Sequence, residues 1–256
     1  MIHKTSIIED GAYIGQNVSI GAFSYISSSC VIGDGTNIGN NATITGRTTL
    51  GKNNKIHSYA LLGSEPQDLK YDGEDSELIM GDNNTVREFS SVNKGTTGGG
   101  NKTIFGNNNL VMSHVHIGHD CIFKNNCVVV SGCVIGGHVE VDDDVIIGGG
   151  SSIHQFVKIG EYAMLAGGSV LLSDLPNYCM AQGNPSSLRG LNLTGIRRKL
   201  KPHIDPLRRA YKEIFTSGDS MREIAKEIIK TDDNEYVIRL ANFVINTKRG
   251  ISRKDI

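Results

Sequence analysis

Aliphatic residues recur at every sixth position along most of the chain. The series runs without a gap over residues 2–62, resumes at Met80, and continues over residues 105–171. Glycine often follows the aliphatic residue, and a small residue often stands four positions after it, as Ala12 does after Ile8. A period of six matches neither an α-helix nor a two-residue alternation. It predicts short strands joined by tight corners, with the large and the small residue both pointing inward.

Asparagine and glycine supply the corners that such a fold needs. Asparagine runs stand at positions 40–41, 53–54, 83–84, 107–109 and 125–126. Both residue types adopt left-handed backbone angles at little cost, so they fit tight turns between short strands. The repeat and its corners predict a mainly β fold, a parallel β-helix. The spacing resembles that of the hexapeptide-repeat family, which implies a left-handed winding with three hexads per coil and a column roughly 40 Å tall, at about 4.8 Å per coil.

Two stretches interrupt the repeat, at residues 64–79 and 94–103. Insertions in a repeat fold leave it as surface loops, and such loops often carry function. After Leu171 the apolar spacing becomes helical. We therefore predict a β-helix with two loop insertions over residues 1–185. We expect residues 186–256 to form a C-terminal α-helical domain that covers the end of the column, because an open coil exposes unpaired strand edges.

Composition and charge narrow the class of protein. With 256 residues, 38% of them hydrophobic, the chain is neither disordered nor collagen-like. It has no apolar run long enough to span a membrane and no signal-peptide layout, so we expect a soluble, cytoplasmic protein that is not an integral membrane protein. Residues 1–184 carry 10 Lys/Arg and 18 Asp/Glu, whereas residues 185–256 carry 16 and 9. The basic tail is compatible with nucleic acid, an anionic membrane surface, a phosphorylated ligand or an acidic protein.

The cysteines follow the repeat and predict no separate chemistry. Cys30, Cys121, Cys127 and Cys133 occupy the small inward position, so we interpret them as buried packing residues rather than metal or redox groups. Cys179 lies outside the repeat, and we assign it no role. The absence of a disulfide framework fits a reducing compartment.

Four histidines, His114, His116, His119 and His138, lie close together in the sequence and off the inward positions, so core packing does not explain them. The spacing of His114 and His119 is similar to that of a trimeric zinc hydratase with a β-helix fold. Its third ligand lies about two coils earlier, where counting along this chain reaches Leu78. We therefore predict no metal site.

General base chemistry fits the histidines better. Three hexads per coil place position 137 directly over position 119, so the Gly137 N–H should lie about one strand spacing from His119. A histidine can take a proton from a nucleophile while a neighbouring N–H binds an oxyanion, and acyl transfer needs both. Asp120, next in the sequence, is placed to orient the imidazole.

Several segments resemble, in order, the family of acyl-carrier-protein:UDP-N-acetylglucosamine O-acyltransferases, which open lipid A biosynthesis for lipopolysaccharide. The resemblance spans the whole chain. The segments are Gln67-Asp68-Leu69-Lys70-Tyr71, His116-Ile117-Gly118-His119-Asp120-Cys121, Gly137-His138-Val139, Ile147-Gly148-Gly149, Ile153-His154-Gln155-Phe156 and Ala181-Gln182-Gly183-Asn184. The family implies an acyltransferase, a homotrimer with active sites between neighbouring columns, and no metal or organic cofactor beyond the phosphopantetheine that carries the acyl group on acyl carrier protein.

The resemblance also implies roles for single residues. His119 matches the general base on the glucosamine 3-hydroxyl, which attacks the thioester of a 3-hydroxyacyl group, and the Gly137 N–H matches the oxyanion donor. Positions that match the sugar-nucleotide site are Asp68, Lys70, His116, His138, Gln155, Asn192 and Arg198. Positions that match the acyl and pantetheine groove are Gly149, His154 and Gly167, of which Gly167 sets the chain length. The basic tail then steers acidic acyl carrier protein rather than nucleic acid.

The sequence departs from the family pattern in the pair Ser113-His114, where a nonpolar residue and an asparagine are familiar, and at three further single positions. Asn93 replaces a histidine, Thr194 a glutamate, and Lys199 an arginine whose bidentate phosphate contact is lost. The base is unaffected, but the acceptor group stays open between the 3-hydroxyl and the amine of a 3-amino analogue. Other readings are a CoA-dependent acetyltransferase, the later N-acyltransferase of the same pathway, a zinc-dependent β-helix hydratase and a non-catalytic β-helix.

Overall fold

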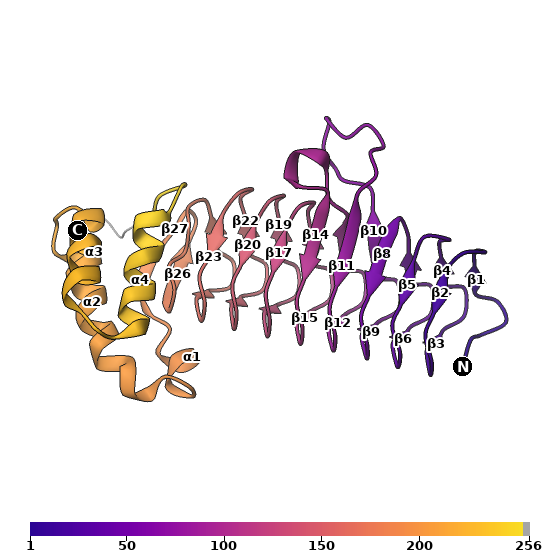
Figure 1. The fold of residues 1–256 in the computed structure, drawn as a ribbon, viewed down its shortest axis with the longest axis horizontal. Helices are drawn as coiled ribbons and strands as arrows, with labels where there is room; N and C mark the ends of the chain where they lie inside the picture. Colours follow the sequence, from indigo (N-terminus) through magenta and orange to yellow (C-terminus); the bar gives the residue numbers. More distant parts are fainter. Residues whose placement is uncertain (253–256) are drawn as a thin grey trace.

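The computed structural model describes residues 1–252 as a long three-sided column with helices at one end (Figure 1). Apart from the last strand, strand partners lie one coil apart and are parallel, as in the pairing of Ile7 with Tyr25. The large residue of most hexads points inward and is completely buried, for example Ile26, Ile44 and Ile117. These features confirm the predicted parallel β-helix, whose core is a stack of aliphatic side chains.

Three parallel sheets form the faces of the column. Sheet 1 contains β1 (Ile7–Ile8), β4 (Tyr25–Ile26), β7 (Thr43–Ile44), β10 (Leu61–Ser64), β13 (Ser91–Asn93), β16 (His116–Ile117), β19 (Val134–Ile135), β22 (Ser152–Ile153) and β25 (Val170–Leu171). Sheet 2 contains β2 (Tyr13–Ile14), β5 (Val31–Ile32), β8 (Arg47–Leu50), β11 (Glu77–Met80), β14 (Lys102–Phe105), β17 (Ile122–Phe123), β20 (Glu140–Val141) and β23 (Lys158–Ile159). Sheet 3 contains β3 (Ser19–Ile20), β6 (Asn37–Ile38), β9 (Lys55–Ile56), β12 (Thr85–Val86), β15 (Leu110–Val111), β18 (Val128–Val129), β21 (Ile146–Ile147), β24 (Met164–Leu165), β26 (Cys179–Gly183) and β27 (Ser186–Leu191).

Both insertions leave the column at the same edge. The first connects β10 of sheet 1 to β11 of sheet 2, and the second, with the short 3-10 helix η1 (Thr97–Gly99), connects β13 to β14. Figure 1 shows the two loops protruding together from the middle of the column. The loops themselves are shorter than predicted and cover residues 65–76 and 94–101, because the strands that flank them continue outward past the corner. We call this edge corner 1–2, and the other two edges corner 2–3 and corner 3–1.

Left-handed residues make the corners, as the asparagine runs predicted. Asn41, Asn53, Asn83, Asn108 and Asn126 all have a φ between 56° and 60°. In several runs the neighbouring asparagine does not have a left-handed backbone. Its side chain accepts or donates hydrogen bonds between coils instead. Aromatic residues occupy other left-handed positions, which the sequence did not indicate: Phe23, Tyr59, Phe89, Phe156, Tyr162 and Tyr178.

The C-terminal segment begins with a strand rather than a helix. Residues 186–191, which we expected in the helical domain, form β27 and pair antiparallel with β26. Burial alternates over Ser186, Ser187 and Leu188, which is the pattern of a strand. The helices start later: α1 (Leu193–Arg197), η2 (Lys201–His203), α2 (Ile204–Thr216), α3 (Met221–Thr231) and α4 (Glu235–Asn246). They cover the end of the column (Figure 1), as predicted.

Two further predictions about the fold can be compared with the structure. Cys30, Cys121, Cys127 and Cys133 are buried and unpaired, and so is Cys179. This confirms that the cysteines of the repeat are packing residues. Within residues 1–252, none of the helices has both the length and the apolar character needed to cross a membrane.

Candidate active site

Corner 1–2 collects the candidate catalytic residues in successive coils. His119 and Asp120 follow β16, Gly137 and His138 follow β19, and the next coil places Gln155 and Phe156 after β22. The His138 N–H donates to the His119 carbonyl at 2.9 Å, which fixes the stacking of the two coils. The predicted superposition of positions 119 and 137 is therefore confirmed. It follows directly from the regular register of the repeat.

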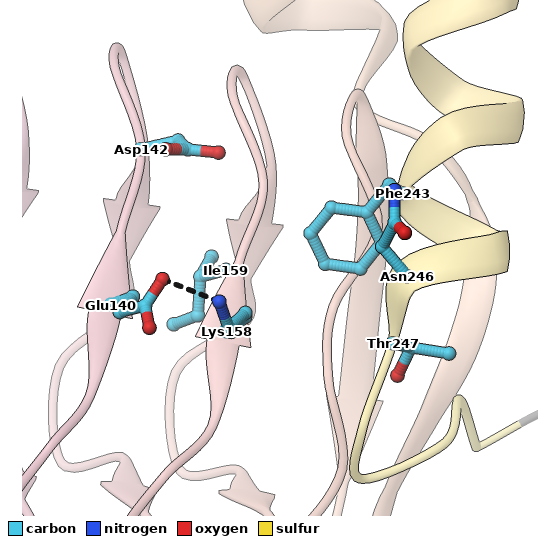
Figure 2. Close-up of a pocket in the computed structure, with 7 residues that line it drawn as sticks. All are labelled: Glu140, Asp142, Lys158, Ile159, Phe243, Asn246 and Thr247. Carbon is cyan, nitrogen blue, oxygen red and sulfur yellow. Dashed lines mark ion pairs between the residues drawn. The ribbon is translucent and has the colours of Figure 1, made fainter.

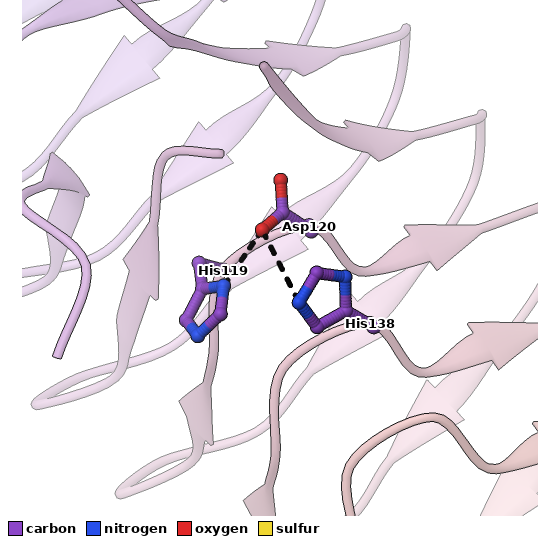
Figure 3. A group of neighbouring side chains, drawn as sticks. All are labelled: His119, Asp120 and His138. Carbon is purple, nitrogen blue, oxygen red and sulfur yellow. Dashed lines mark hydrogen bonds and ion pairs between the residues drawn. The ribbon is translucent and has the colours of Figure 1, made fainter. Parts of the chain in front are cut away.

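His119 and Asp120 form a hydrogen-bonded pair (Figure 3). The Nδ1 atom of His119 lies 2.7 Å from Oδ2 of Asp120, and the two side chains are 12% and 0% exposed. Asp120 adopts a left-handed backbone with φ 59°, which turns its carboxylate toward the imidazole that precedes it. Because the carboxylate accepts the Nδ1 proton, the Nε2 atom of His119 is left without a proton and can accept one.

The carboxylate of Asp120 is held by donors from the second insertion. Thr96 donates its N–H to Oδ1 at 2.7 Å and its hydroxyl to Oδ2 at 2.6 Å. Burial raises the pKa of Asp120, but the hydrogen bonds from His119 and Thr96 outweigh burial and hold this pKa below its ordinary value. Asp120 therefore stays ionised beside the imidazole.

His138 closes the other side of the pair. Its Nε2 atom is 3.7 Å from Oδ2 of Asp120, and its ring stands edge-on to His119. The ring of Phe156 from the next coil stacks on His138 with the centroids 4.3 Å apart. Burial lowers the pKa of His138, although the neighbouring Asp120 carboxylate acts in the opposite direction. His138 is thus favoured in its neutral form.

Gly137 leaves room for the imidazole. A Cβ atom at this position would lie 2.7 Å from Cε1 and Nε2 of His119, closer than any side chain can approach. Gly118 also lies very close to the backbone of the next coil, because a Cβ at Gly118 would be 2.9 Å from the Gly137 nitrogen. Within residues 1–252, the Gly137 N–H donates no hydrogen bond, whereas the N–H groups of Gly136 and His138 do. This free N–H beside the imidazole is a suitable oxyanion donor.

A hollow lies between the two insertions and the corner. Its walls are Asp68, Lys70, Tyr71, Glu74, Thr96, Thr97, Gly98, His138 and Phe156. The structure therefore brings together the predicted pair of Asp68 and Lys70 with His138. His116 lies in β16 of sheet 1, three residues before His119 in the same coil. Its Nδ1 is 2.8 Å from the Ser91 hydroxyl, and burial lowers its pKa.

Comparisons with known proteins agree with this geometry. A family model described as Udp N-acetylglucosamine O-acyltransferase, domain 2, matches residues 174–252, and the model of the bacterial transferase hexapeptide matches residues 11–46 and 29–64. The acyl-[acyl-carrier-protein]–UDP-N-acetylglucosamine O-acyltransferase of Sulfurimonas denitrificans is 67% identical over 251 residues, which are 98% of this chain and 96% of that protein. The solved UDP-N-acetylglucosamine acyltransferase from Campylobacter jejuni is 41% identical, covers 100% of both chains and has a TM-score of 0.96. The chain belongs to this O-acyltransferase family.

Membership of the O-acyltransferase family completes the description of the fold. The hexapeptide match and the solved relative confirm a left-handed winding of the β-helix. A second relative, from Aliarcobacter butzleri, is 52% identical over 98% of this chain and 97% of its own length.

Other residues that the O-acyltransferase resemblance implied lie away from corner 1–2. Gly149 and Gly167 lie at corner 3–1, where a Cβ at Gly167 would be 3.1 Å from the Gly149 carbonyl. Asn192 is buried, caps α1 through Gly195, and donates its amide to the Tyr162 carbonyl at 2.9 Å. Arg198 is exposed at the end of α1. A single chain therefore does not bring these residues to His119.

The remaining predicted residues and the three departures have defined surroundings. His154 and Gln155 are exposed in the coil after Gly137, and the Nδ1 atom of His154 is 3.1 Å from the Gln155 carbonyl. Asn93 is buried and donates its amide to the Ser64 hydroxyl at 2.9 Å, so it ties the bases of the two insertions together. Lys199 pairs with Asp144 at 2.8 Å. Thr194 is exposed on α1.

The histidines that could bind a metal lie at two different corners of the column. His114 is exposed at corner 3–1 and stacks on Phe89, so the candidate zinc pair of His114 and His119 is not brought together. His119, Asp120 and His138 do place three ligand-type atoms within 4.8 Å of one another. Both Asp120 oxygens already accept hydrogen bonds from Thr96, and this favours an orienting carboxylate over a metal ligand.

A second hollow lies between sheet 2 and α4 (Figure 2). It is lined by Glu140, Asp142, Lys158, Ile159, Phe243, Asn246 and Thr247. Its charged groups are paired across coils: Lys158 pairs with Glu140 at 2.7 Å, and Asp142 pairs at 2.6 Å with Lys124, which lies outside the hollow. No charge in this hollow is left over for a ligand among the described residues, so corner 1–2 is the better candidate.

Thr96, Thr103 and Phe156 belong to the site but were not predicted from the sequence. The Thr103 hydroxyl accepts the Asp120 N–H at 2.8 Å. Thr96 could not be found from spacing, because the second insertion breaks the register that predicts which residues stack. The motif Gly95-Thr96-Thr97-Gly98-Gly99-Gly100 was the available signal, since glycines allow a loop to lie directly on a neighbouring side chain.

Proposed function

We propose that this protein transfers a 3-hydroxyacyl group from acyl carrier protein to the glucosamine 3-position of UDP-N-acetylglucosamine, the first step of lipid A biosynthesis. The observation that carries the proposal is the buried His119–Asp120 pair, with Nδ1 and Oδ2 2.7 Å apart and the free Gly137 N–H beside the imidazole. The named activity of relatives up to 67% identical supports the same substrates.

His119 acts as the general base. Its Nε2 atom takes the proton of the 3-hydroxyl while the oxygen forms a bond to the thioester carbon. The Gly137 N–H donates to the carbonyl oxygen as negative charge develops there. When the carbon–sulfur bond breaks, the His119 imidazolium returns the proton to the departing thiolate of the pantetheine. The acyl group arrives already activated as a thioester, so the step needs no metal or organic cofactor.

The hollow beneath the insertions holds the sugar nucleotide. Asp68 and Lys70 lie on the first insertion and His138 on the corner, so donors and acceptors surround the place where a glucosamine ring would meet His119. His116 lies in the coil before that of His138 and Gln155 in the coil after it. Binding by the loops would leave the reacting hydroxyl directed toward the base.

The active enzyme is a homotrimer in this proposal. Gly149, Gly167 and Arg198 lie on other edges than His119, so a site that contains all of them must form between copies. The outward positions of sheet 3 also favour a partner. They change from Ser19, Asn37 and Lys55 in the first coils to half-buried apolar residues later, namely Leu110, Val128, Ile146 and Met164.

Acyl carrier protein docks on the basic C-terminal segment. This segment has an excess of basic groups, and Arg197, Arg198, Arg208, Arg209 and Lys212 are exposed. An acidic partner is steered to such a surface. We place the protein in the cytoplasm, because its five cysteines are unpaired, as expected in a reducing compartment.

The test is acyl transfer by a His119→Ala variant. We expect the rate to fall by about 10²- to 10⁴-fold, while the variant keeps its oligomeric state. His3→Ala, an exposed histidine at the far end of the column, is the matched control and should keep the full rate. A near-normal rate for His119→Ala would contradict the proposal.

The acceptor is tested in the same assay. UDP-N-acetylglucosamine and its 3-amino analogue are incubated separately with the enzyme and a 3-hydroxyacyl carrier protein, and the products are identified by mass spectrometry. Transfer to the hydroxyl supports the proposal as stated. Transfer only to the amine would assign the same site a different nucleophile, one that depends less on a strong base.

A further inference from the structure

The second insertion folds back over the side chain that orients the base. From this loop, Thr96 contributes two hydrogen bonds to Asp120, one to each carboxylate oxygen. Thr96 is itself buried, at 5% exposure, and the Asp120 side chain is fully buried. Water therefore has no access to replace either bond.

The loop lies on Asp120 too closely to be a chance neighbour. A Cβ atom at Gly99 would be 2.0 Å from Cγ of Asp120, so only glycine allows this approach. From the other insertion, Glu74 accepts the Thr97 N–H at 3.1 Å and holds the loop in place. The chain of contacts thus runs from the first insertion through the second insertion to Asp120.

Each Asp120 oxygen has a defined set of donors. Oδ1 accepts the Thr96 N–H, whereas Oδ2 accepts the Thr96 hydroxyl and the Nδ1–H of His119. A carboxylate held at both oxygens cannot rotate about its Cβ–Cγ bond. The direction in which it receives the imidazole is therefore fixed by Thr96, whose hydroxyl and N–H both donate to this carboxylate.

We infer that Thr96 is a positioning residue for acyl transfer: its hydroxyl and N–H hold the Asp120 carboxylate, which in turn orients His119 with Nε2 toward the acceptor. This inference rests on the proposed function, because it assigns Thr96 a role in the same base.

The Thr96 hydroxyl also shares the negative charge of Asp120. Without it, the carboxylate is compensated by fewer donors and stabilises the protonated imidazole of His119 more strongly. The other titratable groups around this cluster are His138, 3.7 Å from Asp120, and Cys121, which is buried next to Asp120. The walls of the hollow add Asp68, Lys70, Tyr71 and Glu74. None of these groups hydrogen-bonds to the Thr96 hydroxyl, so its removal leaves their own contacts unchanged.

The test compares Thr96→Val, which keeps the shape and removes the hydroxyl, with Thr96→Ser, which restores it. For Thr96→Val we expect kcat to fall by about tenfold to a hundredfold, the value of one hydrogen bond to a charged group. The KM for the sugar nucleotide should change little, and the acidic limb of the kcat/KM profile should move to higher pH. Thr96→Ser should recover most of the rate.

A control variant separates positioning from stability. Thr36→Val removes another buried hydroxyl, one that donates to the Gly51 carbonyl at 3.1 Å far from the site. It should lower the melting temperature without changing kcat or the pH profile. If Thr96→Val lowers the rate equally at every pH and Thr96→Ser does not restore it, Thr96 is only structural and the inference is overturned.

A double-mutant cycle tests the route through Asp120. In an Asp120→Ala background, Thr96→Val should have no further effect on kcat, because the group that it positions is gone. Additive losses would overturn the inference. The inference about Thr96 can fail while the proposed function holds. If His119→Ala is inactive and Thr96→Val is fully active, His119 is still supported as the general base and only the role of Thr96 is rejected.

Discussion

Corner 1–2 and corner 2–3 share one backbone conformation and differ in chemistry. The left-handed residues at corner 1–2 include Asp120 and His138, with φ of 59° and 60°, and those at corner 2–3 include Asn108 and Asn126, with the same values. The repeat therefore offers the same local geometry at both edges. Only one of the two edges carries candidate catalytic groups.

At corner 2–3 the polar side chains are satisfied within the column. Asn125 accepts the Asn107 N–H at 2.8 Å, and its own N–H donates to Asp143 one coil further along at 2.9 Å. Asp82 and Lys52 are joined in the same way. This ladder links each coil to the next and leaves no group for a substrate.

At corner 1–2 glycine replaces that ladder. Gly137 stands at the register position of Asn107 and Asn125 and has no side chain to bond to the neighbouring coil, and the insertions provide the partners instead. The imidazole of His119 and the Gly137 N–H remain free as a result. The comparison shows how a regular repeat acquires a site: its internal hydrogen bonds are removed at one edge, and loops from the same edge supply a second wall.

The largest expected effect comes from adding one methyl group at each corner. In Gly137→Ala the new Cβ would lie 2.7 Å from the imidazole, whose ring can swing away, so the fold survives and the base is displaced. We expect kcat to fall by about 10²-fold, as for a displacement of about 1 Å at a catalytic group, with little change in melting temperature. Steady-state kinetics and thermal unfolding measure both.

Gly106→Ala at corner 2–3 is the matched variant. Its Cβ would lie 2.7 Å from the Lys124 carbonyl, which is backbone and cannot move aside. Here stability should fall while the folded fraction keeps its kcat. A Gly137→Ala enzyme with full activity would show that the imidazole does not need its present place.

The sequence predicted what depends on the repeat. Inward residues, corners and the stacking of Gly137 on His119 all follow from a constant register. Thr96, the strand Ser186–Leu191 and the left-handed aromatic residues were not predicted, because each depends on contacts between segments that the period does not relate. The roles of Asn192 and Arg198 came only from the family resemblance, and the single chain leaves both far from the base.

A smaller effect is expected from Asn125→Ala, which breaks the ladder at corner 2–3. The exposed Asn107 N–H loses its protein acceptor and turns to water, so the net loss should be about 0.5 to 1.5 kcal/mol. The melting temperature should fall by about 2 to 4 °C for each kcal/mol. The specific activity below the transition should equal that of the unaltered enzyme. A loss of kcat without a loss of stability would contradict the view that only corner 1–2 takes part in catalysis.

The smallest expected effect is a pH dependence of the free energy of unfolding. It should arise only from groups on the corner 1–2 side of the column. Burial lowers the pKa values of His116 and His138 below 6.5, so the unfolded chain binds protons that the folded chain does not. The free energy of unfolding should therefore fall as pH drops from about 7.5 to about 5.5. The lowered pKa of Asp120 adds a stabilising contribution that is lost only below pH 3.8.

His116→Asn should reduce this pH dependence, measured as the shift of the urea midpoint between the two pH values. The exposed His3, replaced in the same way, is the control and should leave the pH dependence unchanged. Corner 2–3 has no histidine in its repeats, so its ladder adds nothing to the slope. If His116→Asn keeps the full slope, burial of this imidazole is not the cause, and the acid sensitivity lies with His138 alone.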